Sequence, residues 1–85
     1  MAAERRKAQN ERNEEMTRTV VASSNVRSVG YDPSAMTLEV EFHDSSVYQY
    51  RSVPGSVHAG LLGAASKGSY LASHIKNRYP TMKIR

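Results

Sequence analysis

The chain of 85 residues contains no cysteine. Disulfides and thiolate metal sites are therefore excluded as supports for so small a fold. No apolar run approaches the roughly 18 residues that cross a bilayer, and the N-terminus is charged where a signal peptide needs an apolar core. We expect a single soluble, cytoplasmic domain without membrane association.

The sequence also lacks the spacing of a metal or catalytic centre. His43, His58 and His74 are too widely separated to provide helical metal-ligand spacing. His43-Asp44-Ser45 contains the residue types of a catalytic triad, but a triad needs them to converge from separate elements. We therefore expect no catalytic residues, no metal and no cofactor.

Acidic residues are absent from the last quarter of the chain, residues 66–85. Five basic residues lie there: Lys67, Lys76, Arg78, Lys83 and Arg85. Residues 1–22 contain five basic and four acidic side chains, and residues 23–65 are net acidic. The formal net charge of +4 therefore originates in the C-terminal quarter, where its field can attract phosphates or an acidic partner.

Three stretches have the pattern of β-strands. Residues 37–42 alternate apolar with polar side chains, which predicts one set in a core and the other, including Glu39 and Glu41, in water. Residues 25–31 and 47–52 are the other two strands, bounded by turn-forming residues. The connection at residues 43–46 predicts a hairpin, although Ser45 leaves its turn type open.

Two helices are predicted after the strands. The first covers residues 54–65, because Pro54 suits a first helical turn and apolar residues recur at helical spacing. Ser66 is a candidate N-cap for the second, which carries Leu71, Ile75 and Tyr79 on one face and stops at Pro80. Gly60 and Gly63 weaken the first helix, and we expect them to permit close packing.

This order of elements, β-β-β-α-α, predicts an α+β fold. Its three-stranded antiparallel meander is covered on one face by two helices, within a domain at residues 23–80. Residues 1–22 form a charged segment that we expect to be disordered or a frayed helix, because it has no apolar stripe to dock it. Residues 81–85 are expected to be a basic tail.

Tyrosine supplies five of the six aromatic residues. Tyr48 and Tyr50 share one face of a predicted strand and could complete the core or form a base-stacking platform. The other face of the sheet is a poor phosphate surface, since Glu39 and Glu41 would repel it. Both interpretations of the two tyrosines stay open at this point, and we favour the core.

The residues Val29-Gly30-Tyr31-Asp32, Val53-Pro54 and Ser66-Lys67-Gly68-Ser69-Tyr70, followed by Ile75 and Tyr79, occur in a characteristic order. Over residues 23–79 the chain resembles the KTSR domain, a small bacterial module that occurs alone and at the C-terminus of some lysyl-tRNA synthetases. The resemblance implies the fold and RNA binding. Ser45 and Ser73 depart from the family, which usually has glycine and asparagine at those positions.

The basic C-terminal quarter provides the candidate binding site. We expect Lys67, His74 and Arg78 to line one exposed edge of the second helix, with Lys83 and Arg85 extending it. The full set of nucleic-acid-binding candidates is Lys67, Tyr70, His74, Lys76, Asn77, Arg78, Lys83 and Arg85, with Tyr70 as the stacking side chain. Cations near a helix C-terminus also favour the macrodipole and solubility, so a purely structural role is the alternative.

The predicted function is RNA or single-stranded nucleic-acid binding by electrostatic contact with phosphates. The alternative is a protein-interaction or regulatory adaptor, of phage or plasmid type, that binds an acidic partner surface. Either protein is expected to be a monomer or a homodimer.

Overall fold

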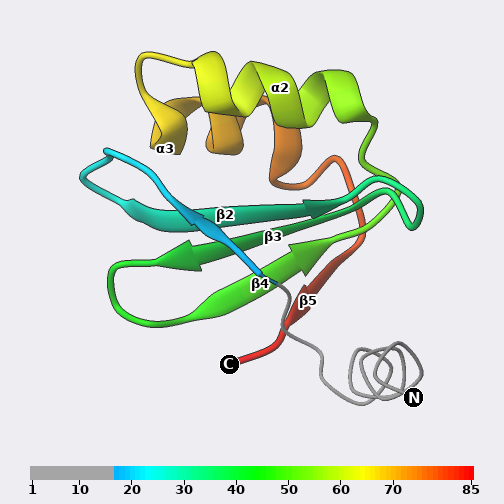
Figure 1. Ribbon diagram of the computed structural model, residues 1–85, viewed down its shortest axis with the longest axis horizontal. Helices are drawn as coiled ribbons and strands as arrows, with labels where there is room; N and C mark the ends of the chain where they lie inside the picture. The colour runs from blue at the N-terminus through cyan, green and yellow to red at the C-terminus, as the bar shows by residue number, and fades with distance from the viewer. Residues whose placement is uncertain (1–16) are drawn as a thin grey trace, which may run out of the picture.

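The computed structural model describes residues 17–85, in which a single antiparallel sheet carries helices on one face (Figure 1). The strands follow one another in sheet order: β1 (Thr19–Val20), β2 (Val26–Asp32), β3 (Thr37–Phe42), β4 (Val47–Tyr50) and β5 (Thr81–Lys83). The helical elements are α2 (Gly55–Gly63), α3 (Lys67–Tyr70) and the π-helical η1 (Leu71–Ile75), which continues α3. Most of the predicted N-terminal segment, up to Met16, lies outside the described residues.

The predicted α+β class and the antiparallel meander are confirmed, but the sheet has five strands instead of three. β1 pairs with β2 through Thr19 and Val29, and β5 pairs with β4 through Met82 and Gln49. The expected basic tail at residues 81–85 is thus an edge of the sheet, and the segment 1–22 includes a strand. Two- and three-residue strands are too short to show an alternating pattern, so only pairing with their neighbours reveals them.

The turn between β3 and β4 forms without glycine. Ser45 has a φ of 75°, in the left-handed region that glycine usually occupies. Its amide donates to the Phe42 carbonyl at 2.9 Å. Asp44 Oδ1 accepts from the Ser46 amide at 3.0 Å and from the Ser46 hydroxyl at 2.6 Å. The side chain of Asp44 therefore holds this turn through local hydrogen bonds.

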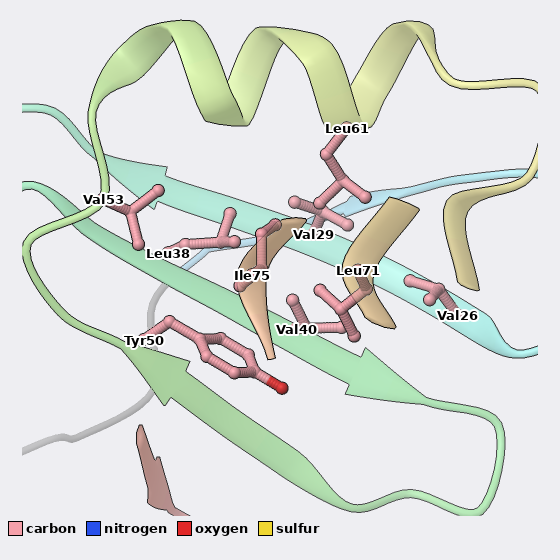
Figure 2. Packing of buried hydrophobic residues seen from close by; sticks show 9 residues of the cluster. All are labelled: Val26, Val29, Leu38, Val40, Tyr50, Val53, Leu61, Leu71 and Ile75. Carbon is pink, nitrogen blue, oxygen red and sulfur yellow. The ribbon is translucent and has the colours of Figure 1, made fainter. Parts of the chain in front are cut away.

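Buried apolar side chains fill the space between the sheet and the helices (Figure 2). They are Val26, Val29, Leu38, Val40, Tyr50, Val53, Leu61, Leu71 and Ile75. Leu61 from α2 and Ile75 from η1 are fully buried against this side of the sheet. Burial of each such side chain contributes about 1.5–3 kcal/mol, so the two helices are docked mainly by these contacts.

The second helix begins as predicted and ends earlier. The Ser66 hydroxyl accepts from the Ser69 amide at 3.2 Å, which confirms the N-cap. The Lys76 amide donates to the Leu71 carbonyl at 2.7 Å, a bond spanning five residues that closes the π turn. The helix therefore ends at Ile75 instead of continuing to Tyr79, and Asn77, with a φ of 69°, follows it.

Gly60 allows α2 and α3 to approach closely. A Cβ atom on Gly60 would collide with the Tyr70 hydroxyl, whereas one on Gly63 would meet nothing within 4 Å. We expected both glycines to allow close packing on the sheet, and that is wrong: Gly60 packs against the neighbouring helix, and Gly63 has no close neighbour.

Glu39 lies on the face of the sheet away from the helices, since it alternates with Leu38 and Val40. We expected this carboxylate to be in water, and that prediction is wrong, because Glu39 is 0% exposed. The Arg18 guanidinium forms an ion pair with it. Gln49 Nε2 also donates to Glu39 Oε1 at 2.7 Å. These partners offset the cost of removing the charge from water.

Candidate functional site

A groove with a volume of about 900 Å³ lies between the β3–β4 hairpin and the connection from η1 to β5. Residues of the strands and hairpin line one side: Phe42, His43, Asp44, Ser46, Tyr48 and Tyr50. Residues of η1, the connection and β5 line the other: Leu71, Ala72, Lys76, Asn77, Arg78, Tyr79 and Thr81. Ser24, Asn25 and Gly68 complete it. The groove lies beside the end of the helical layer at Ile75, where the connection to β5 begins.

Three tyrosines give the groove an aromatic lining. Tyr48 and Tyr50 lie on the helix-facing side of the sheet, opposite Val40 and Leu38 in the β3–β4 register. Figure 2 shows Tyr50 beside these core residues, and it is only 4% exposed. Burial, together with the neighbouring Tyr48, raises the pKa of its phenol. Tyr50 thus belongs to the core, as we favoured from the sequence.

Tyr48 and Tyr79 are less deeply buried and pack against the edge of the core. The ring of Tyr48 meets Phe42 edge to face, with centroids 5.8 Å apart and an interplanar angle of 78°. This contact holds the Tyr48 ring in place while it lines the groove. Tyr48 therefore combines a ring packed on Phe42 with a position in the groove lining.

Lys76, Asn77 and Arg78 are the predicted site residues that the fold brings into the groove. All three are exposed. Arg78 Nε donates to the Ser73 carbonyl at 3.2 Å, which positions its guanidinium near the end of η1. Lys83 is the partner of Tyr48 in the β4–β5 register, and its positive charge acts on Asp44 at the hairpin. The groove thus has cationic side chains near one side.

Asp44 introduces a negative charge at the hairpin end of the groove. Hydrogen bonds from the side chain and backbone of Ser46, and the positive charge of Lys83, lower the pKa of its carboxyl group. Asp44 is therefore ionised near neutral pH. An anionic ligand is expected at the side formed by Lys76 and Arg78, away from this carboxylate.

Four predicted site residues lie elsewhere, so the expected single cationic edge of the second helix does not form. Lys67 Nζ donates to the Ala64 carbonyl at 3.0 Å, across the α2–α3 junction. Tyr70 packs on Gly60 and stacks on His74, with ring centroids 4.4 Å apart. Arg85 donates to the Ser45 carbonyl at 3.2 Å. The physical reason is that η1 ends at Ile75, so Arg78 never shares a helix face with Lys67 or His74.

Gly68 has a packing role at the start of α3. A Cβ atom on this residue would lie 2.7 Å from Asn25 Nδ2. The close approach of the Asn25 side chain supports the structural interpretation of the Ser66–Tyr70 motif. Asn25 and His43 also line the groove, and sequence reasoning selected neither of them as a binding residue.

His43 connects the hairpin to the segment before β2. Its Nε2 lies 2.8 Å from the Ser23 carbonyl, and its amide donates to the Asn25 carbonyl at 3.1 Å. These contacts position two polar residues, His43 and Asn25, on the same side of the groove. No spacing rule could have paired them, because they lie in different connections, Asn25 just before β2 and His43 just after β3.

Charged residues on the opposite face of the sheet form a separate network. The Ser28 hydroxyl donates to Glu41 Oε1 at 2.8 Å, and Arg85 lies 3.2 Å from Glu41 Oε2. The hydrogen bond from Ser28, followed by the charges of Arg18, Arg27 and Arg85, lowers the pKa of Glu41. Arg85 is thus engaged on the face away from the groove, where it braces β3 against the C-terminal end of the sheet.

Among residues 17–85, no group of three histidine or carboxylate side chains is placed to hold a metal ion. None of the helices in this range is long and apolar enough to span a membrane.

The profile of the KTSC domain matches residues 22–79. The chain belongs to the KTSC domain family. The resemblance inferred from the sequence is confirmed, and the family's name is KTSC rather than KTSR. The crystal structure of a KTSC domain protein from Yersinia pestis is similar, with a TM-score of 0.79 and 38% identity. That comparison covers 84% of this chain and 100% of the other.

Two curated relatives show where KTSC domains occur. An uncharacterised protein of Stutzerimonas stutzeri is 41% identical over 64 residues, which are 75% of this chain and 90% of that protein. A lysine–tRNA ligase of a Nostoc species is 38% identical over 54 residues, or 64% of this chain. This KTSC domain corresponds to only 10% of the length of that ligase.

Proposed function

We propose that this KTSC domain binds single-stranded RNA, or another single-stranded nucleic acid, in the groove between the β3–β4 hairpin and residues 76–81. One observation carries the proposal: Lys76 and Arg78 line the same groove as Tyr48 and Tyr79. Cations beside accessible aromatic rings are the combination that single-strand binders use, with phosphates on the cations and bases on the rings.

Each part of a nucleotide has a chemically suitable partner in the groove. Lys76 and Arg78 contact phosphates, with Lys83 contributing from β5. The rings of Tyr48 and Tyr79 contact bases. Asn25, His43 and Asn77 offer hydrogen-bonding groups to base edges, which are exposed only in single strands. The charge of Asp44 favours phosphates at Lys76 and Arg78 over the hairpin end, where Lys83 offsets part of that charge.

The size of the groove limits the ligand to a short segment. Pockets of about 300–1,000 Å³ hold single small ligands, and this groove is near the upper end at about 900 Å³. With three cations available, log affinity should fall against log salt with a slope of about −2. Binding should therefore be weak and easily screened.

The relatives support an RNA ligand without establishing one. Lysine–tRNA ligases, whose name includes an RNA, carry a segment similar to this KTSC domain. We further propose that the protein is cytoplasmic, is a monomer or a homodimer, and binds nucleic acid without catalysis or a cofactor.

Fluorescence anisotropy with a labelled single-stranded oligouridine at low salt tests the proposal. Reversing both groove charges, Lys76→Glu with Arg78→Glu, should weaken binding about tenfold or more, because each lost cation removes a phosphate contact. Arg27→Glu with Arg51→Glu is the matched control, since it also reverses two charges and both arginines are exposed without lining the groove. Equal losses in both variants would show unspecific attraction and contradict a groove site.

The alternative function, an adaptor for an acidic protein, is decided by the same titration. Absence of binding by the unmodified protein at low salt would overturn the RNA proposal and leave the adaptor. Chemical-shift mapping then locates the ligand. Shifts at Tyr48, Lys76 and Arg78 support the groove, whereas shifts confined to the opposite face of the sheet refute it.

A further inference from the structure

We propose that the free edge of β5 binds an extended acidic peptide, which adds to the sheet as a sixth strand. The inference differs from nucleic-acid binding, because it rests on the outward backbone groups of β5 and not on the side chains of the groove. The groups are the N–H and C=O of Thr81 and Lys83, and the mode is strand addition at a sheet edge.

The hydrogen bonds between β4 and β5 determine which backbone groups point outward. The Arg51 amide donates to the Pro80 carbonyl at 2.9 Å, and the Ile84 amide donates to the Val47 carbonyl at 2.7 Å. In an antiparallel pair, hydrogen-bonded positions alternate with non-hydrogen-bonded ones. Met82, opposite Gln49, is therefore the bonded position between these two. Thr81 and Lys83 occupy the non-bonded positions, so their N–H and C=O groups point away from β4.

The edge is accessible along its length. Thr81, Met82 and Lys83 are all exposed, with Met82 at 42%. Proline often guards a sheet edge by removing an outward N–H. Pro80, however, occupies a bonded position, so its missing N–H faces β4 and leaves the outer side of β5 intact.

The positive charge around β5 favours an acidic peptide over a second copy of the chain as the added strand. The segment 76–85 carries four basic residues and no acidic one, so pairing two β5 edges would bring like charges together. A glutamate in the added strand opposite Lys83 would instead form a favourable cross-strand pair. The two-residue β1 at the other edge of the sheet offers a shorter template.

Hydrogen exchange on the full-length, ¹⁵N-labelled chain provides the test. In the free protein, the amides of Thr81 and Lys83 should exchange quickly, and that of Met82 slowly. A short synthetic peptide that alternates glutamate with valine should slow the exchange of Thr81 and Lys83. The same peptide with lysine in place of glutamate should bind more weakly. Binding without protection of these two amides, or no binding, would overturn the proposal.

Two substitutions separate the backbone contribution from the charge. Thr81→Pro removes one outward N–H while leaving the β4–β5 bonds, and should weaken peptide binding about threefold to tenfold. Lys83→Gln removes only the charge and should weaken it about twofold to fivefold at low salt. A Thr81→Pro chain that stays folded and binds the peptide normally would refute strand addition. If the amides of Thr81 and Lys83 became protected without peptide, and more so at higher protein concentration, a second copy of the chain would be the partner. That result would also refute the peptide proposal.

The same variants distinguish this inference from the groove. Thr81→Pro should lose the peptide, whereas Tyr48→Ala should lose oligouridine and keep the peptide. Lys76→Glu with Arg78→Glu should lose oligouridine while the Thr81 and Lys83 amides still become protected by peptide. A separate edge site would be disproved by two results together: the peptide and oligouridine displace each other, and each variant weakens the binding of both to the same degree.

Discussion

The Ser28 hydroxyl on β2 donates a hydrogen bond of 2.8 Å to the Glu41 carboxylate on β3. The two residues are direct partners across the strands, and Ser28 is only 4% exposed. A hydrogen bond to a charged group contributes about 1.5–3 kcal/mol. We therefore expect Ser28→Ala to lower the free energy of unfolding by about 1–2 kcal/mol at neutral pH, measured by urea denaturation. Ser56→Ala, at an exposed position in α2, provides the comparison. An unchanged unfolding midpoint for Ser28→Ala would contradict the importance of this bond.

The stability of the domain should decrease in acid. Hydrogen bonds lower the folded-state pKa values of Glu41 and Asp32, from Ser28 and Ser34 respectively. Carboxyl groups with a lowered folded pKa stabilise the fold above their unfolded pKa, near 4, and lose that contribution as pH falls through the folded pKa. The melting temperature should therefore drop between about pH 5 and pH 2. Ser28→Ala should show a shallower decrease; a steeper one would contradict the link to Glu41.

Leu61 and Leu62 are neighbours in α2 with opposite environments. Leu61 is 0% exposed and Leu62 is 42% exposed. Leu61→Ala should lower the free energy of unfolding by about 2–5 kcal/mol, because it leaves a cavity under the helix. Leu62→Ala should change it by less than about 1 kcal/mol. Denaturant unfolding of the pair measures the difference, and similar losses would show that α2 is docked differently.

Tyr48 should contribute to nucleic-acid binding through its ring. Tyr48→Ala is expected to weaken oligouridine binding by about 1–3 kcal/mol, the usual contribution of a stacked base. Tyr48→Phe keeps the ring and should bind nearly normally. Because Tyr48 also packs on Phe42, thermal unfolding of each variant is needed as a control. Normal binding by a folded Tyr48→Ala chain would show that the hydroxyl-bearing ring is not a ligand contact.

Several elements could be predicted because their signals lie within a few residues. The alternation from Thr37 to Phe42 indicated β3, and Ser66 indicated the start of α3 through a bond to Ser69. The end of that helix could not be predicted in the same way. Ile75 and Tyr79 share helical spacing, which favoured an end at Pro80, but the π turn at Lys76 ends the helix four residues earlier. Asn77, with a φ of 69°, is the local signal that the sequence reasoning passed over.

The candidate site was only partly predictable for a related reason. Lys76, Asn77 and Arg78 were selected from the basic composition, and they do line the groove. Lys67 and Arg85 share that composition but are bound to Ala64 and Glu41. Composition identifies which side chains are cationic, and only the packing of the elements shows which of them face a common ligand.

The pattern of residues along the chain was sufficient to predict the fold class, strand β3 and the Ser66 cap, since these depend mainly on residues that are close in the sequence. The five-stranded sheet, the groove and the burial of Glu39 depend on segments that are distant in the sequence. Residues 47–50 pair with 81–83, and Asn25 packs on Gly68. Such contacts form only when the whole chain has folded, because many alternative pairings are compatible with the same short residue patterns.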